Sequence, residues 1–481
     1  MLDCDKPAVQ TLSERHRKGK ENYQFAAICA ETLSWSEVRN EIASMARSEP
    51  RLTSLKSIPS SRILMSAGAV VAGSISLSPA VAQDGNPYSS IESRIPPEFA
   101  TEPLRVGGFE VSPRIEVDME VIDNVFASDV IDRDDVTVSI RPAISVRDRR
   151  SDRQLSLYAK ATYETYLNNS FADRVLLNAK AQAKLRLDSR TRPFFSLSFR
   201  QNDTRSSEFV DLLTTAQPVQ LTSFGGSGGF DQDFGPITAT IELSYSKTSF
   251  DDEIVSDAGD PSASLSDFQI LSGRLRIAYS VNPSQQLYVE GQINDRNYSA
   301  DETGPAVDID PLADRTSEGF AIRAGMRLRL SDIISLDASA GYLKQRFENV
   351  AFEPISSLSF NADLLYNPSR LTQVRLSGSR SIDDTVNPFF NGLVRTELAV
   401  GVEHELLRNL FIATEGSYRI ISANVTNDLR QSDAEEFEVS GRIRMLISQR
   451  LSVRVRASYF ERGSLFGGSQ LRGLVGLAYS F

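Results

Sequence analysis

The sequence predicts an all-β protein, a transmembrane antiparallel β-barrel of about 18 strands with both termini in the periplasm. Three observations lead to this prediction. Apolar and polar residues alternate over long segments, the connections between these segments alternate between short and long, and no apolar run approaches the ~20 residues that a spanning helix needs. A chain of 481 residues without such a run can still cross a membrane if it forms a closed barrel.

Alternation with period 2 dominates from about residue 109 onward. In the segment 174–187, for example, Val175 and Leu177 alternate with Asn178 and Lys180. Such a segment predicts a strand with one apolar and one polar face, and its length exceeds the ~5–6 residues of an average soluble strand. The predicted strands begin near residues 109, 135, 153, 174, 193, 219, 236, 268, 285, 318, 333, 354, 371, 393, 409, 435, 451 and 469.

The connections between the predicted strands differ in length in a regular way. Those after even-numbered strands are very short, as at 331–332 and 449–450, and those after odd-numbered strands are mostly longer, as at 203–218 and 250–267. Outer-membrane barrels have short periplasmic turns, longer extracellular loops and an even number of strands. A long soluble β-solenoid or a tandem sandwich would explain neither the strand lengths nor this alternation.

The residues before the predicted barrel divide into three parts. Residues 45–82 are typical of a secretory signal peptide, with basic residues, a mostly apolar stretch and a small-residue cleavage pattern at Ala80 and Ala82. Residues 1–44 are interpreted as a non-native or disordered extension, with Met45 as the alternative start and a genuine cytosolic extension as the competing interpretation. Residues 83–108 contain several prolines and no periodicity, which predicts a periplasmic linker without a fold of its own.

The apolar stripe of the last predicted strand runs to the end of the sequence. Leu477, Tyr479 and Phe481 all fall on it. This ending resembles the C-terminal recognition signal of outer-membrane proteins, which the barrel-assembly machinery reads. We therefore expect Tyr479 and Phe481 to serve as the barrel-assembly signal.

Few residues offer catalytic or metal chemistry. Both cysteines and one of the two histidines precede residue 83, so His404 is the only histidine of the predicted barrel, and it falls on an apolar stripe that should face lipid. An acid–base enzyme would normally need such a residue in the lumen. The sequence thus predicts no catalytic residue, no metal site and no cofactor. The formal charge of -11 argues against a nucleic-acid partner.

The predicted lumen carries more basic than acidic residues, although the chain as a whole is acidic. A basic lumen concentrates anions, and arginine forms forked hydrogen bonds to carboxylates and phosphates. The alternative is that these cations pair with lumen acids and tie the wall together, with Glu116, Asp118, Glu403, Glu405, Glu436 and Glu438 as the acids. The candidate residues along the substrate path are Arg141, Arg147, Lys184, Arg186, Arg274, Arg276, Arg323, Arg327, Arg329, Arg375, Arg442, Arg444, Arg454 and Arg456.

The longer connections are acidic, above all at 129–135, 251–260 and 301–314. Oxygen clusters of this kind could bridge through Ca²⁺ or Mg²⁺ to lipopolysaccharide. Simple solvation of exposed loops is the favoured interpretation. The outer-membrane lipid and lipopolysaccharide are expected to surround the barrel in either case.

Short motifs resemble those of one family. VIDNVF at 121–126, IRPAI at 140–144 and NPSR at 367–370 are similar to the opening motif, the proline-bearing strand and a late turn of the putative β-barrel porin 2 family. The resemblance spans roughly residues 105–481. It implies an outer-membrane component of exopolysaccharide or capsule export that receives polymer from a periplasmic polysaccharide-export protein, and it supplies no catalytic residues.

Three functions remain open from the sequence. The first is a conduit for export of an anionic surface polysaccharide. The second is a passive diffusion porin for small anionic solutes, with 250–267 as a candidate constriction loop. The third is an outer-membrane enzyme or adhesin, against which the missing lumen histidine and the acidic loops count.

Overall fold

A computed structural model describes residues 90–125, 127, 133–148, 150, 152–203, 220–250, 267–299, 315–350, 352–383, 390–425, 432–463 and 468–481. Most of them lie in β-strands. No helix among these residues is long and apolar enough to cross a membrane. The predicted extension, the signal peptide with its cleavage residues, and most of the acidic connections lie outside the described residues.

Eighteen long strands, β2 to β19, form the wall. They are β2 (Phe109–Ile122), β3 (Asp135–Asp148), β4 (Arg153–Tyr166), β5 (Arg174–Leu185), β6 (Thr191–Asp203), β7 (Gln220–Phe234), β8 (Ile237–Phe250), β9 (Asp267–Asn282), β10 (Gln285–Ser299), β11 (Ser317–Ser331), β12 (Ile334–Phe347), β13 (Ile355–Ser369), β14 (Thr372–Asp383), β15 (Phe390–Leu407), β16 (Leu410–Val425), β17 (Ser432–Leu446), β18 (Leu451–Gly463) and β19 (Gly468–Ser480). Each begins within three residues of its predicted position, and the predicted strand number is confirmed.

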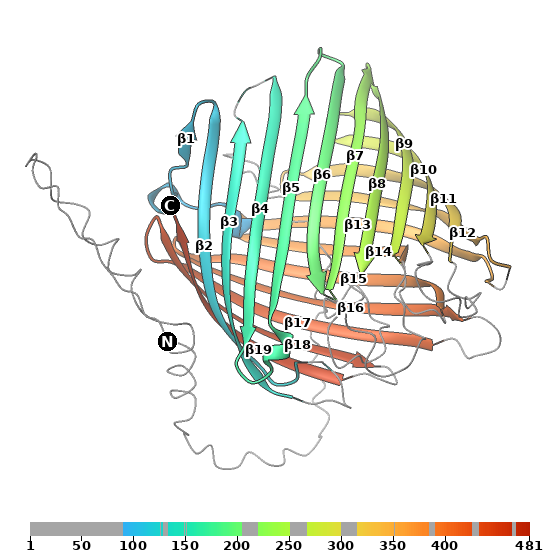
Figure 1. Cartoon of the computed structure of the whole chain (residues 1–481). Helices are drawn as coiled ribbons and strands as arrows, with labels where there is room; N and C mark the ends of the chain where they lie inside the picture. Colours follow the sequence, from blue (N-terminus) through green and yellow to red (C-terminus); the bar gives the residue numbers. More distant parts are fainter. Residues whose placement is uncertain are drawn as a thin grey trace, which may run out of the picture. The chain divides into compact units, whose positions relative to one another are not determined.

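Each strand pairs antiparallel with its neighbour in the sequence, so the colours in Figure 1 run in order around the wall. The last strand closes the ring on the first. β19 pairs with β2, with Leu477 opposite Val117 and Ser480 opposite Arg114. The predicted closed antiparallel barrel is therefore confirmed. Closure removes the free sheet edges that lipid could not satisfy.

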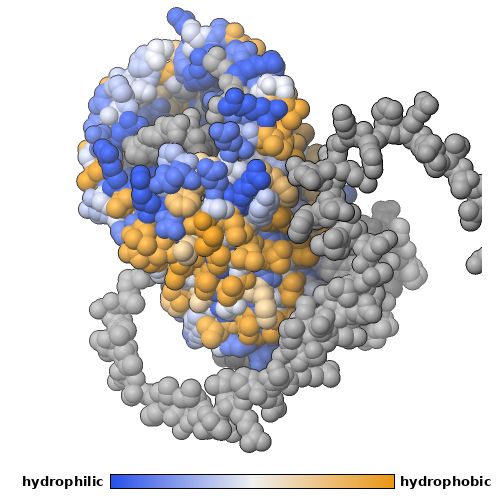
Figure 2. Space-filling model, turned by 90° about the vertical axis from the view of Figure 1, so that its left-hand side faces the viewer, coloured by the Kyte–Doolittle hydropathy of each residue, from blue (hydrophilic) through white to orange (hydrophobic). Residues whose placement is uncertain are grey.

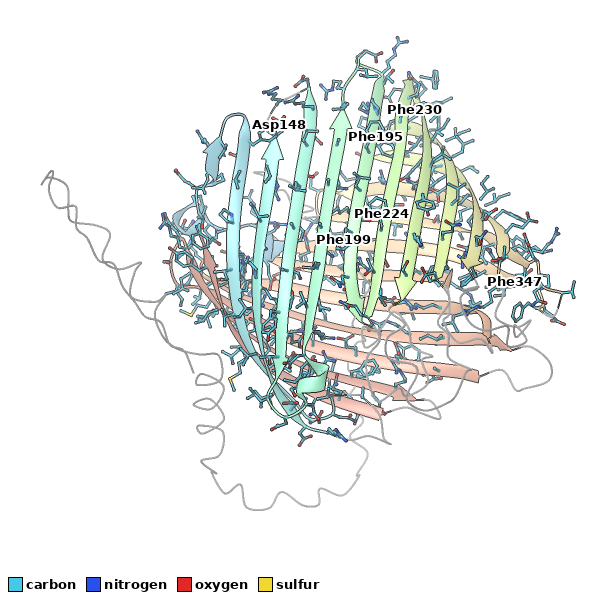
Figure 3. All side chains as sticks on the ribbon, viewed as in Figure 1. Asp148, Phe195, Phe199, Phe224, Phe230 and Phe347 are labelled. Atoms are coloured by element: carbon cyan, nitrogen blue, oxygen red, sulfur yellow. The ribbon has the colours of Figure 1, made fainter. Side chains whose placement is uncertain are left out.

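The outside of the barrel is apolar. Val117, Met119 and Val121 on β2 are all about half exposed, as are Leu471, Val475 and Leu477 on β19. Figure 2 shows the resulting apolar area beside a rim of hydrophilic residues. Aromatic side chains from β6 and β7 stand on the same outer face (Figure 3), among them Phe195, which is 53% exposed. Such a surface is stable only against the acyl chains of a membrane.

Short turns join the strands at one end of the barrel. The connection between β7 and β8, for example, consists of Gly235 and Pro236, and Gly235 has a φ of +74°, a conformation that few other residues adopt. We call this the short-turn end. Both Ser480 and Phe481 bond to backbone there, to the carbonyl oxygens of Arg450 and Pro113.

A glycine-rich stretch at 225–229 lies within β7, and close packing explains one of its glycines. Gly229 is opposite Phe194 of β6 and Glu242 of β8. A Cβ atom on Gly229 would lie 2.7 Å from Cζ of Phe194 and 3.0 Å from Cα of Glu242. The wall at this point therefore has room for a glycine only.

Residues 90–106 differ from the structureless linker that the sequence predicts. They form two short 3-10 helices, η1 (Ile91–Ser93) and η2 (Pro97–Phe99), and a short strand β1 (Leu104–Val106), which pairs with residues 109–111 of β2. The buried side chain of Ile91 packs against Phe411 and Leu446 of the wall. The prediction was wrong because the residues that organise this segment belong to β15, β16 and β17, far away in the sequence.

Further polar contacts hold the same segment at the short-turn end. Thr101 donates a hydrogen bond to the carbonyl oxygen of Gln449, and Glu98 pairs with Arg408 at 3.2 Å. Arg408 lies in the short turn between β15 and β16, and Gln449 lies in the one between β17 and β18. We call residues 90–103 the strap.

Candidate functional site: the charged inner wall

The polar face of the strands lines the inside of the barrel. Residues of opposite charge meet there in register, as where Glu290 of β10 lies between Arg276 of β9 and Arg323 of β11. The apolar residues at alternate positions are exposed on the outside. We call the polar face the inner wall.

The strand alternation places the predicted cations on this wall, with one exception. Arg186 lies beyond the end of β5, in the connection to β6. The others are Arg141, Arg147, Lys184, Arg274, Arg276, Arg323, Arg327, Arg329, Arg375, Arg442, Arg444, Arg454 and Arg456. The structure separates them into several groups with different surroundings.

Three of the predicted arginines surround one buried carboxylate. Glu290 is 4% exposed, and its carboxylate lies 2.7 Å from Arg276, 2.8 Å from Arg323 and 3.6 Å from Arg274. Arg274 also pairs with Glu242 of β8. These arginines join four neighbouring strands, which is the wall-tying role that the sequence left as an alternative.

A second group spans the closure of the barrel. Asp118 of β2 is 2% exposed and pairs with Arg141 of β3. Arg454 of β18 reaches across β19, and its Nε atom lies 3.0 Å from Asp118 while its Nη2 atom lies 2.8 Å from Glu116. Pairing of these two acids with lumen cations is the alternative that the sequence left open, and both acids are paired here.

A third group includes two arginines that are not among the predicted lumen cations, Arg419 and Arg462. Glu436 of β17 lies 3.0 Å from Arg419 of β16 and 2.9 Å from Arg462 of β18. Arg456 lies 3.8 Å from Glu438. The same alternation that identified the other cations places Arg419 and Arg462 on the inner wall, so the signal to find them was present.

A cavity of about 620 Å³ lies at the short-turn end of β9 to β14. Its lining includes Arg327, Arg329 and Arg375, together with Asp337 and Asp363. Arg327 donates two hydrogen bonds to Asp337, at 2.9 and 2.7 Å, yet its side chain is 58% exposed. Cations in this cavity thus keep access to a solute.

The remaining predicted cations lie near acids or in the strap contact. Lys184 lies 3.1 Å from Asp231, and Arg147 is opposite Glu110 in the β2–β3 pair. Arg442 and Arg444 both touch Glu92 of the strap. The inner wall is therefore a set of charge pairs with differing access, rather than a uniformly basic surface.

His404 lies where the sequence predicts it. It is opposite Thr372 and Ile412 in register, on the outward face of β15, and its Nδ1 atom is 2.9 Å from Oγ1 of Thr372. No group of histidine, cysteine and acidic residues in the described ranges could hold a metal ion. Nothing on the described inner wall brings a histidine to its acids.

The final aromatic residues also take their predicted positions. Tyr479 and Phe481 lie at the short-turn end with their ring centroids 5.1 Å apart, and both side chains are more than a third exposed. They are accessible on the outer face of β19. A role as barrel-assembly signal stays a prediction.

Comparison with known proteins gives one family match. The family model described as putative β-barrel porin 2 matches residues 96–478, which is almost the whole described barrel. No curated protein matches the chain.

Solved structures with a similar fold are outer-membrane barrels. The outer membrane protein opdK from Pseudomonas aeruginosa is 11% identical with a TM-score of 0.41, and the match covers 77% of this chain and 99% of opdK. OccAB4 from Acinetobacter baumannii is 11% identical with a TM-score of 0.42, covering 80% and 100%. The siderophore receptor PirA from Pseudomonas aeruginosa is 10% identical with a TM-score of 0.39, covering 79% and 81%.

Proposed function

The chain belongs to the putative β-barrel porin 2 family and is an outer-membrane β-barrel of the porin type, and from this premise we propose that it exports an anionic surface polysaccharide. A barrel of 18 strands is wide enough for an aqueous channel. The cargo would pass through the barrel without any chemistry on the inner wall. Energy would come from polymer synthesis or from inner-membrane machinery.

The accessible arginines of the inner wall carry this proposal. Arg327, Arg375 and Arg456 are 58%, 38% and 41% exposed, although each has a carboxylate within 4.0 Å. A cation that is partly neutralised by its neighbour binds an anion weakly. Conduction needs many weak sites of this kind, because a polymer has to enter and also to leave.

The partners follow from the same proposal. With the short turns in the periplasm, the short-turn end would receive polymer from a periplasmic polysaccharide-export protein. Tyr479 and Phe481 would be read by the barrel-assembly machinery, and residues 45–82 would direct export of the chain. Outer-membrane lipid and lipopolysaccharide would cover the apolar outer face.

The test is a clean deletion strain in which surface and periplasmic polysaccharide are measured in parallel. We expect surface polymer to fall and periplasmic polymer to rise, with both restored by complementation. A matched control complements with a variant that carries Lys344→Glu and Arg346→Glu on the outward face of β12. Unchanged surface polysaccharide in the deletion strain would contradict the export function.

The cavity beside Arg327 favours passive diffusion of small anions as a second candidate function. Its volume of about 620 Å³ is in the range of ~300–1,000 Å³ that is usual for small-molecule sites. This function predicts normal surface polysaccharide in the deletion strain together with reduced uptake of small anions. The two functions therefore give opposite results in the same strain.

A further inference from the structure

The strap brings one residue, Glu92, to two of the predicted lumen arginines, with its carboxylate at Arg442 and its backbone oxygen at Arg444. Oε1 of Glu92 accepts a hydrogen bond of 2.9 Å from Nε of Arg442, and its backbone oxygen accepts one of 3.2 Å from Nη1 of Arg444. The Glu92 side chain is only 17% exposed. A carboxylate that comes from outside the wall thus already occupies this place.

The wall here has more capacity for an anion than Glu92 uses. Nε of Arg444 is buried and has no hydrogen-bond partner among the described residues. No carboxylate in the described part of the chain is seen to pair with Arg444. A buried cationic donor without an acceptor is costly, and an anionic ligand with several oxygens would satisfy it.

The other described contacts of residues 90–92 with the wall are with its side chains and not with the backbone of the strand ladders. Glu403 accepts a hydrogen bond of 2.6 Å from the Ser90 hydroxyl and one of 3.2 Å from the backbone N–H of Glu92. Ile91 supplies one apolar anchor against Phe411 and Leu446. The ladders that pair β15 with β16 and β16 with β17 contain no residue of the strap.

We propose that Arg442 and Arg444 form a carboxylate subsite on the export path, that Glu92 fills it at rest, and that carboxylates of the cargo displace Glu92 and release the strap. The proposal rests on the function proposed above and names its ligand class, a polymer of uronic acids or similarly carboxylated sugars. Competition for the same arginines couples arrival of cargo to clearing of the short-turn end. A neutral polymer would not release the strap.

The first experiment compares three variants of the full chain, purified and reconstituted in planar bilayers, with an oligogalacturonate as the probe. We expect Glu92→Gln to bind the probe several-fold more tightly than the parent protein, because the internal competitor is lost. Arg442→Gln should bind it several-fold more weakly. Glu98→Gln, which removes a strap carboxylate that pairs with the exposed Arg408, should leave the affinity unchanged.

The opposite changes in affinity expected for Glu92→Gln and Arg442→Gln distinguish a Glu92 that competes with the cargo from a Glu92 that only holds the strap in place. If Glu92 only braced the strap, Glu92→Gln would not tighten binding of the probe, and that result would overturn the proposal. Equal binding of a neutral dextran of the same length would overturn it as well. Affinity is read from block of the ionic current, so a variant that fails to fold is recognised by the absence of channels.

A second experiment tethers the strap. Ile91→Cys with Phe411→Cys places one cysteine on the strap and one on its contact in the wall, in a chain whose Cys4 and Cys29 are changed to serine. We expect the oxidised form to lose the probe's effect on the current and reduction to restore it. The matched control, Ser440→Cys with Ser458→Cys, links register partners within the wall. The probe should block its current equally in the oxidised and the reduced form.

These measurements are separate from the export test. If the deletion strain keeps its surface polysaccharide but the variants behave as expected, the subsite stands and the export function fails. If export is lost in the deletion strain but tethering has no effect on the current, the strap proposal fails and the export function stands.

Discussion

At the scale of single residues, inner-wall carboxylates differ in importance because they differ in burial. Glu290 is 4% exposed among three guanidinium groups. We expect Glu290→Gln to destabilise the barrel by about 3–5 kcal/mol, because removing one partner leaves buried positive charge uncompensated. The measurement is urea unfolding of the protein in lipid vesicles. The folded fraction is read from the different electrophoretic mobilities of the folded and unfolded forms.

The matched control for Glu290 is Asp363. Its ion pair with Arg375 is 3.7 Å long, and the two side chains are 44% and 38% exposed. Solvent screens such a pair, so Asp363→Asn should cost only about 0–1 kcal/mol. Equal losses for the two variants would show that burial does not decide the strength of these pairs.

Gly476 gives a second prediction at this scale. A Cβ atom here would overlap the carboxylate of Asp118 and lie 3.1 Å from Nε of Arg454. We expect Gly476→Ala to destabilise the barrel by about 1–3 kcal/mol through crowding at the closure. Gly473→Ala is the control on the same strand, since a Cβ atom there meets nothing within 4 Å, and a similar loss from it would contradict the explanation.

At the scale of elements, the connection between β5 and β6 depends on an ionised aspartate. Asp188 accepts hydrogen bonds of 2.7 Å from the backbone N–H groups of both Arg190 and Thr191. These bonds hold the pKa of the Asp188 carboxyl below its usual range. A carboxyl whose pKa is lower in the folded state stabilises that state most when it is ionised.

The pH dependence of this turn follows from the direction of the shift. The stabilisation should be complete above the ordinary aspartate pKa of about 3.9 and should disappear as the pH falls through the lower, folded value. We expect Asp188→Ala to lower the unfolding midpoint at pH 7 and to have no effect at the acid end of that range. Thermal unfolding of both proteins as a function of pH measures this, and a pH-independent difference would contradict it.

The elements themselves were largely predictable from sequence. β2 and β19 alternate so regularly that their two faces follow from period 2 alone, because one face must meet lipid. The strap was not predictable in the same way. Ile91 and Glu92 have no periodic pattern around them, and their partners lie more than three hundred residues away.

At the scale of the whole molecule, charge on the inner wall should decide ion selectivity. We expect Arg327→Glu with Arg329→Glu to shift reconstituted channels toward cations, lowering the anion-to-cation permeability ratio several-fold. The measurement is the reversal potential across a salt gradient. Lys344→Glu with Arg346→Glu makes the same change in net charge on the outward face, and an equal shift from it would contradict a role for the inner wall.

Arg454 is deliberately left unchanged in that experiment. Reversing its charge would place a third carboxylate beside Asp118 and Glu116, and like charges at that distance would oppose closure of the barrel. Arg329 and Arg327 line the cavity at the short-turn end instead, where solvent is accessible. The Arg327→Glu and Arg329→Glu variant therefore tests ion selectivity without adding charge repulsion at the closure of the barrel.

The sequence by itself determined the class of fold, the number of strands and the side of each strand that faces lipid. Those properties depend on period 2 and on the lengths of connections, which are local. It also determined that Arg276, Arg323 and Arg442 belong to one polar face. The family resemblance seen in its short motifs is confirmed over residues 96–478.

Only the tertiary structure decided what those arginines meet. Register brings Glu290 between Arg276 and Arg323, and closure brings Asp118 within reach of Arg454, although hundreds of residues separate the last two. Access of a ligand to an arginine depends on such neighbours. The sequence does not distinguish an arginine in a buried ion pair from an exposed one. The physical reason is that electrostatic interactions depend on distance and burial, and both are set by the folded chain.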